Sequence, residues 1–132
     1  MPKRRRYDEV PTCAMMATLN LLNGRWKGVI LYYLLVKGTL RFNELHRHLP
    51  GCTPRLLVKQ LRELEEDAFI IRTVYPVVPP KVECALSEEG RTIGPLLLQL
   101  NTWGEGWLER RGLRKSHEPS ACLAEDTLSP KE

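Results

Sequence analysis

The sequence lacks any apolar run that approaches the roughly 18 residues needed to cross a membrane as a helix. Its first residues, Met1 to Arg6, are mostly basic and do not contain the apolar segment of a signal peptide. We therefore expect an intracellular, cytoplasmic protein. The chain has 132 residues, of which 42% are hydrophobic and 27% charged, and this size and composition predict one globular domain with a modest core.

Cysteine and histidine patterns that hold metals or disulfides are missing as well. The four cysteines are widely scattered: Cys13, Cys52, Cys84 and Cys122. This spacing favours neither a zinc ribbon nor a disulfide framework. His46 and His48 lie near Cys52, but side chains two positions apart on a helix point about 160° away from each other. We therefore expect no metal site, and these histidines are predicted to lie at the rim of a short helix.

The sequence contains no recognisable catalytic motif either. A Ser-His-Asp set, a phosphate-binding loop, a carboxylate pair and a metal-binding box are all missing. A nucleophile built from Cys13 and His46 would require a proximity that nothing in the sequence predicts. We therefore expect neither an enzyme nor a cofactor.

Positive charge is in excess, with 20 lysines and arginines against 16 aspartates and glutamates and a formal net charge of +4. This balance favours a polyanionic partner, although many enzymes share it. The basic arm, residues 1–12, carries Lys3 to Arg6, which either enter a DNA minor groove or form a solvated tail. The composition turns polar after Gly112, so residues 113–132 are predicted to be a disordered tail and residues 13–112 the folded domain.

Apolar residues recur at helical spacing through residues 13–35, with an interruption at Asn23-Gly24. The pattern predicts a short helix, a break, and a second helix that begins at about Arg25. Gly38 is placed where a glycine commonly ends a helix. The N-terminal third of the domain is therefore expected to be helical.

A short helix and a longer one are predicted next. Residues 40–42 are too few for more than a bridge of strand, and residues 43–49 fit about two helical turns. Pro50-Gly51 stops this helix, and another is predicted over residues 53–67. Two helices joined by so tight a turn are typical of a helix-turn-helix unit.

A β-hairpin and a long helix complete the domain. Residues 69–75 and 81–86 are rich in β-branched residues, and the prolines between them cannot pair at the hairpin tip. Residues 87–90 are expected to begin one long helix. Its apolar positions are three or four apart: Ile93, Leu96, Leu97, Leu100, Trp103 and Trp107. The order of elements predicts an α+β, mostly α, winged helix-turn-helix fold with a two-stranded wing.

The charges of residues 53–67 run against the helix macrodipole, which favours acids at the start and bases at the end. Arginines and a lysine come first, and four acids crowd the end: Glu63, Glu65, Glu66 and Asp67. Recognition helices enter the major groove by their N-terminal part, so bases there attract phosphate while acids leave the groove. The dipole penalty is under about 1 kcal/mol. Roughly six to ten phosphate contacts easily outweigh it.

A helical wheel separates this segment into an apolar side and a basic side. At about 100° per residue, Leu57, Leu61 and Leu64 share a sector roughly 60° wide. The opposite side carries three cations: Arg55, Lys59 and Arg62. Thr53 is placed to cap the helix and Pro54 to occupy its first position. Apolar burial on one side and DNA contact on the other are therefore predicted for one helix.

The predicted DNA contacts extend beyond this helix. The residues expected to contact DNA are Thr53, Pro54, Arg55, Lys59 and Arg62, with Arg41, Asn43 and Lys81 for phosphate or wing contacts. An alternative is a solvated, salt-paired helix face, because Lys59 with Glu63 and Arg62 with Glu66 are i, i+4 pairs. A second alternative is a winged helix used for protein contacts without specific DNA binding.

With these elements in this order, the chain resembles the HxlR-type regulators, a MarR-like branch of bacterial winged-helix transcription factors. The resemblance covers roughly residues 13–110 and is carried by motifs in order: Cys13, Gly24-Arg25-Trp26-Lys27, Leu40-Arg41-Phe42-Asn43-Glu44-Leu45, Leu49-Pro50-Gly51, Leu61-Arg62-Glu63-Leu64-Glu65, Val74-Tyr75-Pro76, Pro79-Pro80-Lys81-Val82-Glu83, Leu86-Ser87 and Trp103. The chain departs from the family pattern at Ala14, Cys52, Ala68 and Cys84. Ala68 is expected to restrict the turn into the wing, because alanine does not tolerate positive φ as glycine does.

The resemblance implies a homodimer that binds a pseudo-palindromic operator, often near its own gene, through N- and C-terminal dimerisation helices. The last helix carries more apolar surface than a chain this size covers, and the residues expected at the dimer interface are Leu96, Leu100, Trp103 and Trp107. The alternative is that this helix closes the domain's own core. Operator sequence, target genes and the choice between repression and activation stay open.

Several members of the family sense electrophiles or oxidants through the cysteine that matches Cys13. The resemblance therefore makes Cys13 the candidate redox sensor, with an electrophile or another small molecule as effector. A position near a helix N-terminus and a basic arm lowers a thiol pKa. The alternative is a buried, unreactive Cys13, because free cysteines are often buried. Cys52 and Cys84 are further thiols on which a switch could depend.

Overall fold

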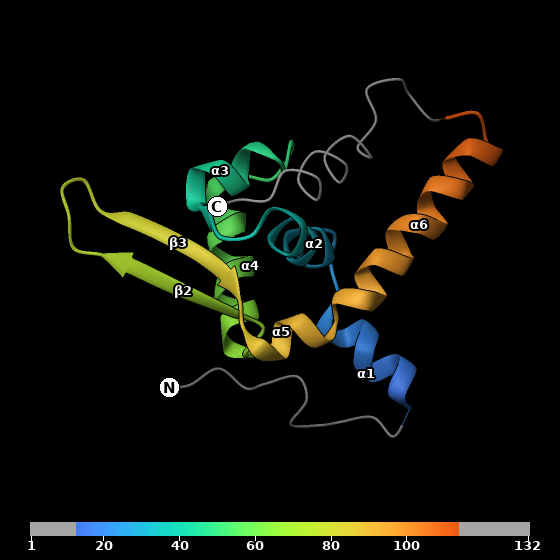
Figure 1. Cartoon of the computed structure of the whole chain (residues 1–132), viewed down its shortest axis with the longest axis horizontal. Helices are drawn as coiled ribbons and strands as arrows, with labels where there is room; N and C mark the ends of the chain where they lie inside the picture. Colours follow the sequence, from blue (N-terminus) through green and yellow to red (C-terminus); the bar gives the residue numbers. More distant parts are fainter. Residues whose placement is uncertain (1–12, 114–132) are drawn as a thin grey trace.

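Helices make up most of the fold, and the computed structural model describes residues 13–113 (Figure 1). The helices are α1 (Ala14–Leu21), α2 (Lys27–Lys37), α3 (Phe42–Arg47), α4 (Pro54–Glu66), α5 (Glu88–Thr92) and α6 (Gly94–Arg110). The basic arm and the polar tail from residue 114 onward lie outside the described residues. Within residues 13–113, none of the helices has both the length and the apolar character of a membrane span.

The sheet is three-stranded and antiparallel, in the order β1-β3-β2. Its strands are β1 (Leu40–Arg41), β2 (Ile70–Tyr75) and β3 (Lys81–Leu86). β1 adds a two-residue bridge to β3, and the β2–β3 pairing runs from Ile70 opposite Leu86 to Tyr75 opposite Lys81. Figure 1 shows this hairpin extending away from the helices as a wing. The predicted strand bridge, hairpin and unpaired tip are confirmed.

The core lies where α2, α3 and α4 meet the base of the sheet. Leu57, Leu61 and Leu64 of α4 are at most 2% exposed, so the predicted apolar side of this helix is confirmed. They pack with Leu31 of α2 and Leu45 of α3 in one hydrophobic cluster. A fully buried leucine stabilises the fold by about 1.5–3 kcal/mol. The apolar side therefore fixes which face of α4 is turned outward.

The predicted long helix after the wing is wrong, because the structure has two helices in its place. α5 ends at Thr92, and α6 begins at Gly94. Pro95 lies in the first turn of α6, where its missing N–H costs nothing, whereas in a continuous helix its ring would clash with the preceding turn. Figure 1 shows α6 leaving the body of the domain after this break.

The turn from α4 into the wing contains an alanine in the left-handed region. Ala68 has φ 67°, and its N–H donates to the Glu65 carbonyl at 2.9 Å. The N–H of Phe69 donates to the Leu64 carbonyl at 2.9 Å, which completes a Schellman motif of the kind that glycine usually supplies. Ala68 was expected to restrict this turn, but it adopts the positive φ that the turn requires. The backbone cost at this position is about 1–2 kcal/mol.

Candidate nucleic-acid interface

The start of α4 has the predicted cap. The hydroxyl of Thr53 accepts a hydrogen bond from the Leu56 N–H at 3.1 Å, and Pro54 occupies the first turn. The turn before it is held by a contact of 2.7 Å between His46 Nε2 and the Cys52 carbonyl oxygen. Thr53 and Pro54 are both exposed, so the N-terminal end of α4 is open to solvent.

The three cations predicted for α4 lie together on its outer face. Arg55, Lys59 and Arg62 are exposed and line one shallow depression of about 500 Å³. The same depression is lined by Val58, Glu63 and Glu66. This basic face is opposite the buried leucines, so the fold presents positive charge outward while it anchors the helix inward.

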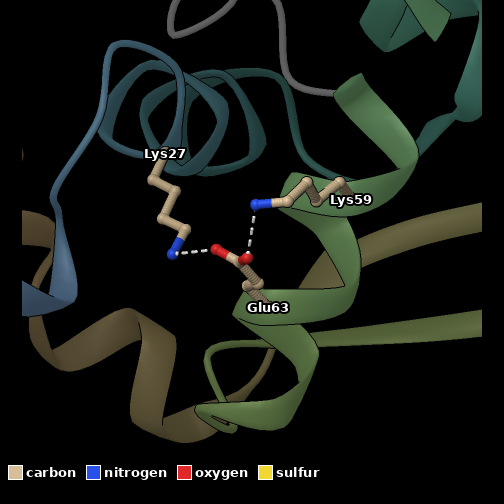
Figure 2. A network of polar contacts seen from close by, with 3 residues as sticks. All are labelled: Lys27, Lys59 and Glu63. Atoms are coloured by element: carbon tan, nitrogen blue, oxygen red, sulfur yellow. Dashed lines mark hydrogen bonds and ion pairs between the residues drawn. The ribbon is translucent and has the colours of Figure 1, made fainter. Parts of the chain in front are cut away.

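A buried ion-pair network that the sequence did not predict supports this face (Figure 2). The ammonium of Lys27 in α2 is fully buried and lies 2.6 Å from Oε1 of Glu63 in α4. Oε2 of the same carboxylate accepts a hydrogen bond from Lys59 Nζ at 2.9 Å. Burial favours a higher pKa for Glu63, but hydrogen bonds and charge attraction from the two lysines outweigh burial and lower its pKa from 4.5 to about 2. Glu63 is therefore ionised at neutral pH.

Of the two salt pairs that the alternative interpretation of this helix predicted, the structure has one. Lys59 forms its predicted i, i+4 pair with Glu63. Within residues 13–113 the structure has no matching pair between Arg62 and Glu66. The Lys59 side chain stays 63% exposed despite its pair. The basic face is therefore not cancelled by its own acids.

Arg41, Asn43 and Lys81 come together beside the wing. They line a groove of about 550 Å³ between the start of α3 and the wing tip. Lys81 is already engaged, with its ammonium 4.6 Å from the centre of the Tyr75 ring and 3.7 Å from Oε2 of Glu83. Arg41 and Asn43 are exposed. Of the three, Lys81 is therefore the least available to a new partner.

The basic face of α4 and the groove at the wing are continuous. A third hollow, of about 130 Å³, shares Val58 and Arg62 with the α4 depression and Phe42 and Val82 with the wing groove. This connecting hollow is also lined by Arg72, whose Nε lies 3.2 Å from Oε1 of Glu65. Arg72 could not be predicted as a candidate from the sequence, because a charged residue in a wing strand is ordinary. One continuous surface thus joins the α4 and wing candidates.

The apolar residues predicted for a dimer interface lie on α6, and most are exposed. Trp103 is 65% and Leu100 53% exposed, Leu96 is also exposed, and Trp107 is half-buried. The arginines that follow cover part of the indoles, with the Arg110 guanidinium 5.8 Å from the centre of the Trp103 ring. α1, the N-terminal dimerisation helix that the resemblance implied without naming residues, exposes apolar side chains as well: Met15, Met16 and Leu19. A groove of about 460 Å³ between α1, α2 and α6 joins the two helices.

The cysteines of the described chain differ in exposure. Cys13 is exposed and immediately precedes α1, in the N-cap position. Cys52 and Cys84 are buried; burial raises the pKa of both thiols, that of Cys84 to about 11. Buried thiols of raised pKa carry little thiolate and react slowly. Among residues 13–113, no cluster of histidine, cysteine and acidic side chains is suited to a metal ion.

Comparison with known proteins gives one consistent result. A family model described as HxlR-like helix-turn-helix matches residues 21–112. YdeP of Bacillus subtilis (strain 168), named as an HTH-type transcriptional regulator, is 47% identical over 103 residues, or 78% of this chain and 80% of YdeP. The matched residues include α4, the turn before it and the wing.

Solved structures agree with the sequence comparison. The redox regulator HypR in its oxidised form is 48% identical, with a TM-score of 0.66 over 71% of this chain and 96% of that one. The reduced form of HypR is 47% identical, with a TM-score of 0.68 over 71% of this chain and 92% of that one. The winged helix-turn-helix architecture is therefore common to this chain and both structures.

Proposed function

The chain belongs to the HxlR-like helix-turn-helix family of transcriptional regulators, and from this premise we propose that it binds a pseudo-palindromic operator as a homodimer. The observation that carries the proposal is the exposed basic face of α4, with Arg55, Lys59 and Arg62 opposite the buried leucines. The free N–H groups of the first helical turn and these cations suit phosphate and guanine edges in a major groove.

The surface beside α4 supports a second set of contacts. Arg41 and Asn43 line the groove next to the wing, and the connecting hollow brings Arg72 into the same surface. Phosphate contacts position a protein on the duplex, while base contacts specify the sequence. We assign phosphate contacts to Arg41 and Arg72 and base contacts to Arg55 at the entering end of α4.

A second copy of the chain is the proposed occupant of the apolar face formed by α1 and α6. Leu96, Leu100 and Trp103 of α6 are exposed, and the groove toward α1 continues this face. A two-fold partner would cover the same surface on both copies. Two copies of α4 then reach successive major grooves about 34 Å apart.

Cys13 is the proposed site of redox or electrophile sensing. HypR, to which the chain is similar, is named a redox regulator, and Cys13 is exposed at the start of α1. Modification of its thiol would alter the apolar face that α1 shares with α6. Diamide or a quinone is expected to release operator DNA from the wild type but not from Cys13→Ser, measured by fluorescence anisotropy. Equal release from both proteins contradicts a Cys13 switch.

The experiment that tests DNA binding is a mobility shift on the DNA upstream of the protein's own gene. We expect a specific complex that resists random competitor DNA of the same length, with a preference of about 10³-fold or more. A control fragment from within the coding region should shift only with the affinity of random DNA. Binding to the upstream fragment that is no tighter than binding to the control would refute the proposed function at this locus.

A further inference from the structure

Two electrostatic effects disfavour a charged lysine at position 27. It is the first residue of α2, where the helix macrodipole disfavours a cation, and its side chain is fully buried. A buried ammonium requires a counter-charge, since desolvation otherwise favours the neutral amine. Glu63 supplies that charge at 2.6 Å.

Glu63 in turn stands between a buried and an exposed lysine. Figure 2 shows its two carboxylate oxygens directed to different ammonium groups, Oε1 to Lys27 and Oε2 to Lys59. The Lys59 side chain is 63% exposed on the basic face, whereas Glu63 is 10% exposed. The three side chains together carry one net positive charge, and the Lys59 ammonium is the one on the outer surface.

We propose that Lys27 is a positioning residue for DNA binding: it neutralises Glu63 from inside the domain and so leaves the charge of Lys59 available to a DNA phosphate. The inference rests on the proposed DNA binding by α4. If an uncharged residue replaced Lys27, the Glu63 carboxylate, which lies 2.9 Å from Lys59, would cancel the positive charge of Lys59. Lys59 would then no longer attract a DNA phosphate. The lowered pKa of Glu63 is consistent with this balance, because the hydrogen bonds and charges of both lysines cause it.

The charges that face Lys59 set the expected result. Arg55, Arg62, Glu63 and Glu66 line the depression around Lys59. Of the two acids, Glu63 is the one to which Lys59 donates a hydrogen bond. Loss of the Lys27 charge therefore acts on the number of phosphates that the dimer neutralises, which the salt dependence of binding measures. A purely structural role of Lys27 changes stability and leaves that dependence unchanged.

The first test compares Lys27→Met with the double variant Lys27→Met/Glu63→Leu in the full chain. Operator affinity is measured by fluorescence anisotropy at several salt concentrations. For Lys27→Met, the slope of log K against log salt is expected to flatten by about 0.9 for each protomer. The double variant removes a neutral pair and is expected to restore the wild-type slope, with an affinity close to that of the wild type. Lys37→Met, which removes a lysine from the same helix, is the control for net charge.

A second comparison does not depend on the folding of Lys27→Met. Lys59→Met is measured in the wild type and in the Lys27→Met/Glu63→Leu background, which keeps no unpaired buried charge. The inference predicts the same flattening of the slope in both backgrounds. A Lys59→Met effect that is absent in the wild type and present in the double variant would overturn it, because Glu63 would then already cancel Lys59.

These outcomes are distinct from those that test the proposed function. Failure of the wild type to prefer operator DNA refutes the proposed function and removes the basis of this inference. Specific wild-type binding, together with a Lys27→Met slope equal to that of the wild type, overturns this inference alone. The inference is also overturned if the Lys27→Met/Glu63→Leu variant keeps the flattened slope of Lys27→Met.

Discussion

Gly90→Ala is expected to destabilise the domain by about 3 kcal/mol or more, because overpacking against backbone cannot be relieved by a rotamer change. A Cβ at Gly90 would overlap the carbonyl oxygen of Phe69 and lie 3.1 Å from its carbon. That carbonyl accepts the Ser87 N–H at 3.0 Å, and the Ser87 hydroxyl donates to the Ala68 carbonyl at 2.6 Å. The close approach of α5 to the turn between α4 and the wing therefore depends on Gly90.

Urea unfolding followed by circular dichroism measures this effect, and Gly104→Ala is its matched control. Gly104 is inside α6, and among the described residues a Cβ built there meets no heavy atom within 4 Å other than its chain neighbours and the helix's own backbone. A glycine-to-alanine change inside a helix stabilises by roughly 0.5–1 kcal/mol. Opposite signs for the two variants are the expected result. Equal, small effects would show that the contact between α5 and Phe69 can open at little cost.

Trp103→Glu is expected to separate the proposed dimer and to lower operator affinity by about a hundredfold or more, because linked binding sites gain roughly 10²–10⁴-fold over single ones. Trp103 is 65% exposed, so its loss removes little of the domain's own core. A glutamate buried against the apolar face of a second copy would also lack a counter-charge. Sedimentation velocity gives the oligomeric state, and anisotropy gives the affinity for a two-half-site duplex.

The control for Trp103→Glu places the same charge on the neighbouring exposed position. Thr102 is exposed on α6, about 100° around the helix from Trp103. Thr102→Glu should remain dimeric and bind operator nearly as the wild type does. A Trp103→Glu variant that stays dimeric, with unfolding equal to wild type, would assign the apolar face of α6 to another role.

Most of the fold could be predicted from periodicity and turn chemistry, because those signals are local. Thr53 and Pro54 marked the start of α4, and the spacing of its leucines marked its buried side. The break before α6 was also present in the sequence, at Gly94-Pro95, but the regular apolar spacing through it favoured a single helix. Local backbone chemistry at proline prevailed over hydrophobic periodicity there.

The basic face of α4 could be predicted, whereas the network beneath it could not. Lys59 and Glu63 are one turn apart, so their pair follows from helical geometry. Lys27 lies in another helix, and a lysine is ordinarily expected at the surface, so its burial depends on how α2 packs against α4. The resemblance implied an N-terminal dimerisation helix, but the exposed side chains of α1 were not predicted individually, since helical spacing predicts an apolar side and not what covers it.

The central claim is that the outer face of α4 binds DNA, and the salt dependence of operator binding by Arg55→Gln/Arg62→Gln tests it most directly. Lys37→Gln/Arg91→Gln removes the same charge from other helices and is the control. We expect the α4 variant to lose at least tenfold in affinity and its slope of log K against log salt to flatten by about 0.9 per lost phosphate contact, while the control keeps the wild-type slope. An α4 variant with the affinity and slope of the wild type would show that this face does not bind DNA.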